Sequence, residues 1–142
     1  MPLRRRYPHG MTHGQCLCGA VRFTIDGPLR DVVVCHCSIC RRLHGGPAAY
    51  TACEMDALHM DEADALRHFD IADATYSFCG ICGSQLFWRR PSLSYVALSA
   101  AAVDQPTGLR TTCHIFVGSA GDYEDLSTTL PKHIEYSDSA AV

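Results

Sequence analysis

The sequence predicts a single domain that is mainly β-sheet. Its 142 residues suit one domain, which would bury roughly two thirds of the surface of its unfolded chain. Short runs of β-branched and aromatic residues recur along the chain and are separated by turn residues. Such regularly spaced short strands are typical of β-rich domains. Only residues 61–69 have much helical propensity, and they form a short segment.

The first third of the chain predicts a leader and two strands. Residues 1–13 contain three arginines but no apolar stretch, so they do not resemble a secretory signal, and we expect a flexible leader. The alternating stretch 15–26 predicts a strand that ends at the turn Gly27-Pro28. Residues 29–35 predict a buried strand that runs directly into a group of cysteines.

The remainder of the chain predicts further strands and little helix. Residues 40–46 predict one helical turn, because two glycines and a proline would end it. Residues 61–69 predict a short helix. The further predicted strands lie at 48–55, 74–79, 84–90, 93–100 and 110–117. We expect one metal-binding domain over residues 14–135, followed by a flexible tail at 136–142.

Composition excludes several classes of protein. Hydrophobic residues make up 47% of the chain, but no apolar run approaches the roughly 18 residues of a membrane span. The net charge is -3 and the arginines are scattered, which argues against a nucleic-acid-binding surface. Without an export signal we expect a cytoplasmic protein. In that reducing compartment the nine cysteines would bind metal rather than form disulfides.

Two cysteine pairs can together hold one metal ion. Cys16 and Cys18 are two residues apart, and on a strand their thiols would point to the same face. Cys79 and Cys82 bracket a glycine-containing turn, which is typical of a zinc knuckle. Four thiolates complete the shell of a structural zinc ion, whose binding would contribute to the free energy of folding. A redox C-x-x-C motif is disfavoured because no βαβ pattern surrounds it.

A second group consists of Cys35, Cys37 and Cys40, with no fourth cysteine at ligand spacing. Three protein ligands and one open position are typical of catalytic zinc sites, and the open position could bind the sulfur of an outside thiol as thiolate. Alternatively, a histidine closes this shell and the second site is structural too. The candidates for that ligand are His36, His44 and His114. For His36 we expect a core or supporting role, because it would point away from the ion on an extended segment.

Two arginines lie next to the second cysteine group. Arg41 and Arg42 directly follow it and could pair with the carboxylates of a bound thiol. The alternative is that both are ordinary solvated charges. Cys53 and Cys113 lie in apolar strand patterns, and we expect them to be buried and inert.

Three segments together resemble the glutathione-dependent formaldehyde-activating enzyme family, which includes the centromere protein V type. They are GQCLCGAVRF from residue 14, CHCSICRRLHG from residue 35 and FCGICGSQLFW from residue 78. The resemblance extends to about residue 131 and implies a β-tent fold of antiparallel sheets with two zinc ions. It places the structural zinc on Cys16, Cys18, Cys79 and Cys82. It places the catalytic zinc on Cys35, Cys37 and Cys40.

The resemblance also implies a reaction, in which glutathione and formaldehyde form S-hydroxymethylglutathione. We therefore expect a zinc-dependent carbon-sulfur lyase that acts on a small-molecule thiol, such as glutathione, and a small aldehyde. Any of the three histidines named above could move the hydroxyl proton. One alternative is a zinc-stabilised binding module without turnover, in which neither zinc responds to added thiol. The other is the same zinc chemistry on a different thiol adduct.

Overall fold

The computed structural model describes residues 11–135, and over this range strands dominate. Ten strands, one α-helix and three 3-10 turns make up its regular structure. The predicted mainly β fold with short sheets is confirmed. The predicted tail and residues 1–10 of the predicted leader lie outside the described residues, so the proposed division into leader, domain and tail stays a prediction.

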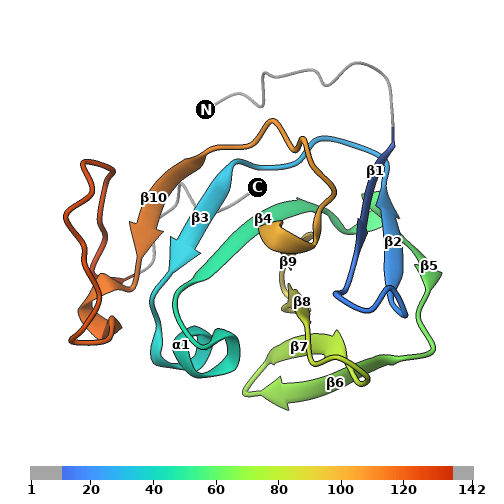
Figure 1. The fold of residues 1–142 in the computed structure, drawn as a ribbon, viewed down its shortest axis with the longest axis horizontal. Coiled ribbons are helices and arrows are strands. Elements are labelled where there is room, and N and C mark those ends of the chain that lie inside the picture. Colours follow the sequence, from blue (N-terminus) through green and yellow to red (C-terminus); the bar gives the residue numbers. More distant parts are fainter. Residues whose placement is uncertain (1–10, 136–142) are drawn as a thin grey trace.

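A small antiparallel sheet forms one side of the molecule, at the right of Figure 1. Its strand order is β1-β2-β5, with bounds Thr12–Gln15, Arg22–Ile25 and Leu58–Glu62. Thr12 pairs with Ile25, and the pairing continues through His13. The last two residues of the predicted leader therefore belong to this sheet, because backbone pairing with β2 extends the strand past the expected boundary.

A larger sheet of seven strands carries the rest of the fold, in the order β10-β3-β4-β9-β8-β7-β6. In this order the strands span Thr111–Ile115, Val32–Cys35, Ala48–Glu54, Tyr95–Ser99, Gln85–Arg89, Ala74–Cys79 and Leu66–Ile71. All neighbours are antiparallel except β10 and β3, which run parallel side by side (Figure 1). The five strands predicted between residues 48 and 117 are confirmed.

Helix α1, Ser38–His44, is the α-helix of the described chain and confirms the predicted helical turn. It begins after Cys37, which caps it, and it ends at Gly45 in the left-handed conformation with φ of 72°. The 3-10 turns η1, η2 and η3 span Met55–Ala57, Ala100–Ala102 and Val117–Ser119. Within residues 11–135, no helix has the length and apolar character needed to cross a membrane.

The helix predicted over residues 61–69 is wrong. This stretch contains the end of β5, a turn, and the first part of β6. Strand β6 pairs with β7 over six residue pairs, and the ring of Phe69 stacks on that of Tyr76 across the two strands at 5.3 Å. Cross-strand pairing and aromatic stacking therefore override a local helical propensity that is weak over so few residues.

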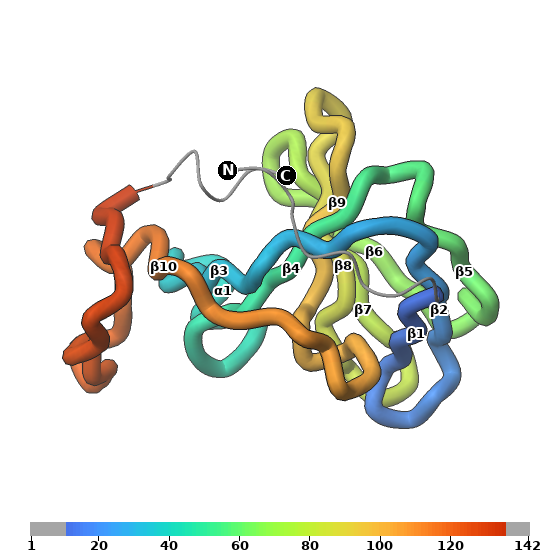
Figure 2. The backbone as a smooth tube through the Cα atoms, turned by 90° about the horizontal axis from the view of Figure 1, so that it is seen from above, coloured from blue at the N-terminus to red at the C-terminus, as the bar shows by residue number. Residues whose placement is uncertain are grey.

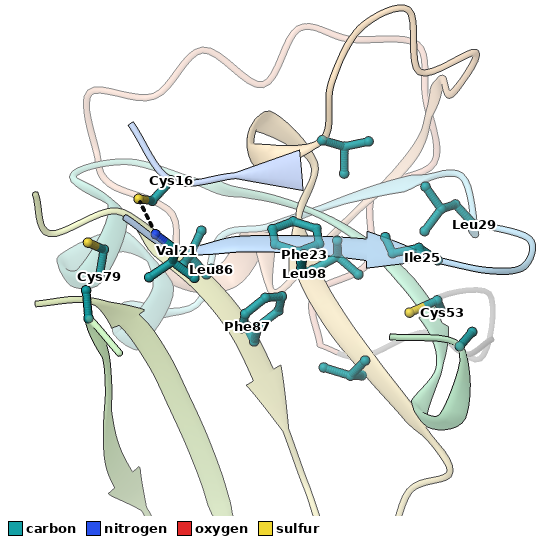
Figure 3. Close-up of a cluster of buried hydrophobic side chains, with 14 residues drawn as sticks. Cys16, Val21, Phe23, Ile25, Leu29, Cys53, Cys79, Leu86, Phe87 and Leu98 are labelled. Atoms are coloured by element: carbon teal, nitrogen blue, oxygen red, sulfur yellow. Dashed lines mark hydrogen bonds between the residues drawn. The ribbon is translucent and has the colours of Figure 1, made fainter. Parts of the chain in front are cut away.

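The main core lies between the small sheet and the central strands of the large one. Phe23 and Ile25 on β2 face Leu86 and Phe87 on β8, and the rings of Phe23 and Phe87 meet edge to face at 5.1 Å (Figure 3). Cys53 on β4 is also fully buried in this core, as predicted. Cys113, in β10, is likewise buried.

After β10 the chain forms an extended C-terminal segment, residues 117–135, which reaches away from the two sheets (Figure 2). It returns along the outer edge of β10, where the amides of His114 and Phe116 donate to the carbonyls of Pro131 and Glu135 at 2.9 and 3.1 Å. The amide of His133 donates to the carbonyl of His114 at 2.9 Å. These bonds cover the free edge of the large sheet.

Gly14 on β1 allows the small sheet to approach the core closely. A Cβ at this position would overlap the ring of Phe23 and lie 2.7 Å from the carbonyl oxygen of Ala102. Gly14→Ala should lower the free energy of unfolding by about 1–3 kcal/mol, because the overlap forces the packed core to shift. Urea denaturation of the metal-loaded protein measures this change.

Gly46→Ala is the matched control for Gly14→Ala. No heavy atom lies within 4 Å of the position that its Cβ would take, and its φ is not in the left-handed region. Its stability should stay within about 0.5 kcal/mol of the parent. Equal stability of the two variants would contradict the close approach at Gly14.

Candidate metal centres

The structure brings the two outer cysteine pairs together. The Sγ atoms of Cys16, Cys18, Cys79 and Cys82 all lie within 4.8 Å of one another and could hold a metal ion. Sγ of Cys18 lies 3.6 Å from that of Cys16 and 3.8 Å from that of Cys79. Cys79 and Cys16 are buried and border the main core (Figure 3). We refer to these four residues as the four-sulfur cluster.

The strand expected to align Cys16 and Cys18 is absent, because β1 ends at Gln15 and a turn follows. The amide of Cys16 donates to the carbonyl of Val21 at 3.0 Å, and Gly19 takes a positive φ of 78° inside the turn. The amide of Val21 also points at Sγ of Cys16, 3.3 Å away (Figure 3). A strand could not aim an amide at the sulfur in this way, so the turn suits a thiolate better than the predicted strand does.

A second turn carries Cys79 and Cys82. The amide of Gly83, whose φ is 78°, donates to the carbonyl of Cys79 at 2.8 Å. The hydroxyl of Ser84 lies 3.2 Å from Sγ of Cys82 and accepts a hydrogen bond from the amide of Leu17 at 3.0 Å. Hydrogen bonds from the side chain and then the backbone of Ser84 lower the pKa of Cys82 to about 5. Ser84 therefore connects the two turns and favours a thiolate between them.

The other predicted group also assembles. Sγ atoms of Cys35, Cys37 and Cys40 lie within 4.8 Å of one another, and we call these residues the three-sulfur cluster. Cys35 ends β3, Cys37 caps α1, and Cys40 lies in the first turn of α1, where its amide donates to Sγ of Cys37 at 3.3 Å. The junction of a strand and a helix thus brings the three thiols to one point.

Without a cation the three-sulfur cluster favours a single thiolate. Hydrogen bonds from Cys35 and then Cys40 lower the pKa of Cys37 to about 2, whereas hydrogen bonds with Cys35 and then Cys37 raise the pKa of Cys40. A second negative charge at this distance is strongly unfavourable unless a cation offsets it. Three thiolates can therefore coexist here only around a metal ion, and soft sulfur donors suit zinc.

Within residues 11–135, no histidine or carboxylate atom joins the three sulfurs within 4.8 Å. The three histidines considered as closing ligands make other contacts. The ring of His36 hydrogen-bonds to His114 and Glu124, and the ring of His44 hydrogen-bonds to the hydroxyl of Tyr50 at 2.9 Å. The described side chains thus supply three ligands at this cluster and four at the other.

A chain of hydrogen-bonded polar side chains starts at His36, between two cysteines of the three-sulfur cluster. His36, which is 2% exposed, places Nε2 2.8 Å from Nδ1 of His114 and Nδ1 2.8 Å from the carboxylate of Glu124. Glu124 also accepts a hydrogen bond from the amide of Gly121. Burial raises the pKa of Glu124, but the bonds from Gly121 and His36 outweigh it, so the net pKa lies below its ordinary value. The supporting role expected for His36 fits this geometry.

Sequence reasoning missed Glu124. It lies 88 residues from His36 in the chain and belongs to the C-terminal segment, which has no ligand-like spacing. Arg41 favours the charged form of Glu124 through electrostatic attraction. The only signal available was the presence of an acidic residue in a segment that also contains glycine and proline, and that signal is too common to be used.

A cavity of about 360 Å³ adjoins the three-sulfur cluster. The three cysteines form part of its wall, and the rest of the lining is largely aromatic and aliphatic. Arg41 and Arg42 do not line this cavity. The two arginines could therefore pair with a bound thiol, as predicted, only if that thiol extends beyond the cavity.

The cavity wall also contains strained backbone. Among the described residues, Ala72 and Phe116 are the ones other than glycine with positive φ, at 54° and 55°. Both line the cavity, Ala72 from the turn between β6 and β7 and Phe116 from the end of β10. Positive φ is unfavourable for residues other than glycine; for Ala72 the two-residue turn between paired Ile71 and Ala74 accounts for it.

A second, wider depression of about 630 Å³ lies between the four-sulfur cluster and α1. His44 lines this depression, whereas its hydrogen-bond partner Tyr50 lines the cavity. Burial raises the pKa of Tyr50 and lowers the pKa of His44, so both are neutral near pH 7. One neutral hydrogen-bonded pair therefore connects the two concave surfaces.

A family model and a solved structure match this chain. The model of the family described as "Glutathione-dependent formaldehyde-activating enzyme" matches residues 11–119. The chain belongs to this family. Among solved structures, it is similar to the crystal structure of a Rhodobacter sphaeroides protein, a structural genomics target, at 26% identity with a TM-score of 0.56. That match covers 70% of this chain and 99% of the other.

The seven clustered cysteines all lie within the part that matches the glutathione-dependent formaldehyde-activating enzyme family. Glu124 lies beyond its last matched residue, 119. The chain of hydrogen bonds behind the three-sulfur cluster therefore combines the family's matched region with a segment outside it.

Replacing Glu124 should destabilise the protein. Glu124→Ala leaves the ring of His36 and the amide of Gly121 without their acceptor, and should lower the free energy of unfolding by about 1–3 kcal/mol. Glu124→Gln keeps an acceptor oxygen and should lose less. Asp125→Asn, at an exposed neighbour that bonds only locally to Ser127, is the control. Urea titration measures the free energy of unfolding of each variant. An equal loss in Asp125→Asn and Glu124→Ala would contradict the role of Glu124.

Proposed function

We propose that this protein is a zinc-dependent enzyme of the carbon-sulfur lyase type that reversibly joins a small-molecule thiol to an aldehyde. The observation that carries the proposal is the three-sulfur cluster in the wall of a cavity, with no fourth ligand from the described residues. Family membership supports the reaction class. The second zinc would bind at the four-sulfur cluster and hold the fold together.

The donor set of the three-sulfur cluster fits a catalytic zinc ion. Zinc bound to Cys35, Cys37 and Cys40 would supply a coordination position for an outside sulfur and lower the pKa of that thiol. The cavity fixes where the rest of the ligand lies. Holding sulfur and aldehyde side by side converts a reaction between two dilute molecules into one between oriented neighbours.

The chemical step needs one proton transfer to oxygen. The sulfur lone pair forms the carbon-sulfur bond, the carbonyl π electrons move to oxygen, and that oxygen takes up a proton to become the adduct's hydroxyl. In reverse, the hydroxyl loses its proton, the carbonyl re-forms, and sulfur leaves with the bonding electron pair. A donor and acceptor of protons beside the aldehyde oxygen would assist both directions.

Tyr50 and His44 are the residues we assign to this proton. Tyr50 lines the cavity, so its hydroxyl could donate to the developing alkoxide, while Nε2 of His44, 2.9 Å from that hydroxyl, could pass a proton to it. The opposite side of this pair opens to the wider depression. Of the three histidines considered from the sequence, His44 is the one whose ring bonds to a cavity-lining side chain among the described residues.

Exchange NMR with ¹³C-labelled formaldehyde and a thiol tests the activity directly. Zinc-loaded protein should speed interconversion of free aldehyde and S-hydroxymethyl adduct above the spontaneous rate, in proportion to protein concentration. An unchanged exchange rate would reject turnover. Tight thiol binding without faster exchange would make the protein a carrier, and no thiol response at all would favour the zinc-stabilised binding module.

The two clusters should respond differently to loss of one sulfur. Cys37→Ser should stay folded, bind one zinc instead of two and lose exchange activity, because the four-sulfur cluster is intact. Cys79→Ser should unfold or aggregate, because metal binding there contributes to folding. Metal analysis and circular dichroism provide the measurements. Equal structural damage in both variants would contradict the separate roles of the clusters.

Removing the cavity hydroxyl should slow the chemical step. Tyr50→Phe should lower kcat by about 10²–10⁴-fold, because the oxygen loses its general acid, with a smaller effect on thiol binding. Tyr123→Phe, at a side chain that is 72% exposed, is the control. Unchanged kcat in Tyr50→Phe would remove Tyr50 and His44 from the mechanism.

A further inference from the structure

Aromatic side chains from four strands meet around the cavity beside the three-sulfur cluster. Tyr50 lies on β4, Tyr76 on β7, Trp88 on β8 and Tyr95 on β9, and Phe116 follows β10. Tyr76 and Tyr95 are buried, and Trp88 and Phe116 are half-buried. At about 360 Å³ the cavity is near the small end of the roughly 300–1,000 Å³ range of ligand sites. It suits a compact, flat group.

The lining contains no aspartate, glutamate or lysine among the described residues, and its two cationic residues are Arg30 and Arg90. Arg30 is 9% exposed and donates through Nη2 to the carbonyl of Tyr50 and through Nε to that of Asp31. Nε of Arg90 lies 3.1 Å from the carboxylate of Asp73, and its guanidinium lies 5.3 Å from the ring centroid of Trp88. The side chain of Arg90 is 41% exposed and its Nε forms no hydrogen bond within the described residues, so the cation buried in the cavity wall is Arg30, which is bonded to backbone carbonyls.

A peptide thiol with charged ends fits this lining poorly. Glutathione carries two carboxylates and an ammonium group at neutral pH. Moving such groups into an apolar cavity without partners is strongly unfavourable. An aromatic group would instead exchange water contacts for contacts with Tyr76, Trp88 and Phe116.

We propose that this cavity selects thiols and thiol-aldehyde adducts whose organic group is uncharged and aromatic. The inference rests on the proposed function, because it assumes that sulfur binds at the three-sulfur cluster. Sulfur at the metal fixes one end of the ligand, and the aromatic walls fix the other. Ala72 of the β6-β7 turn and Phe116 after β10 contribute two further parts of this wall.

Binding of three thiols to cobalt-substituted protein tests the selectivity. The probes are benzyl mercaptan, 2-mercaptoethanol and glutathione, and the readout is the sulfur-to-cobalt absorption as each thiol is added. Benzyl mercaptan should bind at least about tenfold more tightly than either other thiol, as expected for burial of one aromatic ring. Equal affinities, or tighter glutathione binding, would overturn the inference and leave the proposed function intact.

Trp88 provides a second readout that does not depend on sulfur. It is the single tryptophan of the chain and lines the cavity, so its fluorescence should change when benzyl alcohol, which has no thiol, enters. A fluorescence change without any cobalt response to thiols would support the aromatic cavity and overturn the proposed function. A cobalt response to thiols without any fluorescence change on adding benzyl alcohol would overturn the aromatic cavity and support the proposed function.

Two wall variants and one control complete the test. Trp88→Leu and Phe116→Gly should each weaken benzyl mercaptan binding about fivefold or more and leave 2-mercaptoethanol binding unchanged, because only the aromatic contacts are lost. Glycine suits the positive φ at residue 116, so that variant should fold even if Trp88→Leu does not. Phe78→Leu removes a half-buried ring outside the cavity lining and should change neither affinity. Equal weakening of both thiols in the wall variants would overturn the inference.

Discussion

The close approach of cysteine sulfurs from distant parts of the chain is the constraint on which the rest of the structure depends. The four-sulfur cluster joins the turn after β1 to the turn after β7, and its cysteines Cys18 and Cys79 are 61 residues apart. The first turn belongs to the small sheet and the second to the large sheet. Because the main core lies between these sheets, whatever holds the four sulfurs together also fixes how that core closes.

The second cluster differs in what surrounds it. Its three sulfurs come from one short junction between β3 and α1, so they tie no distant segments together. A buried hydrogen-bonded chain supports the junction on one side, and an aromatic cavity adjoins it on the other. Sulfur ligands that are not needed to join the sheets are available for chemistry, which is the physical reason to assign different roles to the two clusters.

The sequence was sufficient to predict the grouping of the cysteines, because ligand spacing is local within each motif and seven cysteines leave few ways to combine them. The mainly β fold followed from short strands and frequent turns. The strand expected at Cys16 was wrong: β1 ends at Gln15, and the turn that follows places the amide of Val21 3.3 Å from Sγ of Cys16. The helix expected at residues 61–69 was wrong, because pairing between β6 and β7 decided the outcome.

What the sequence could not predict depends on contacts between remote residues. No local pattern links Glu124 to His36 or Tyr50 to the wall of a cavity, and the cavity itself exists only where several strands meet. The arginines that follow the cysteines illustrate the same limit. Because Arg41 and Arg42 directly follow Cys40 in the sequence, a ligand-binding role was expected. Both lie on α1, and neither lines the cavity.

The C-terminal segment also shows that the folded domain extends beyond residues 11–119, the part that matches the family model. Its backbone covers the edge of β10, and its Glu124 completes a hydrogen-bonded chain that begins at His36, between two cysteines of the three-sulfur cluster. Expression of the matched residues alone would therefore leave a sheet edge unprotected and the ring of His36 without its carboxylate partner. Conversely, changes in this terminal segment offer evolution a way to adjust the surroundings of the three-sulfur cluster while every cysteine stays the same.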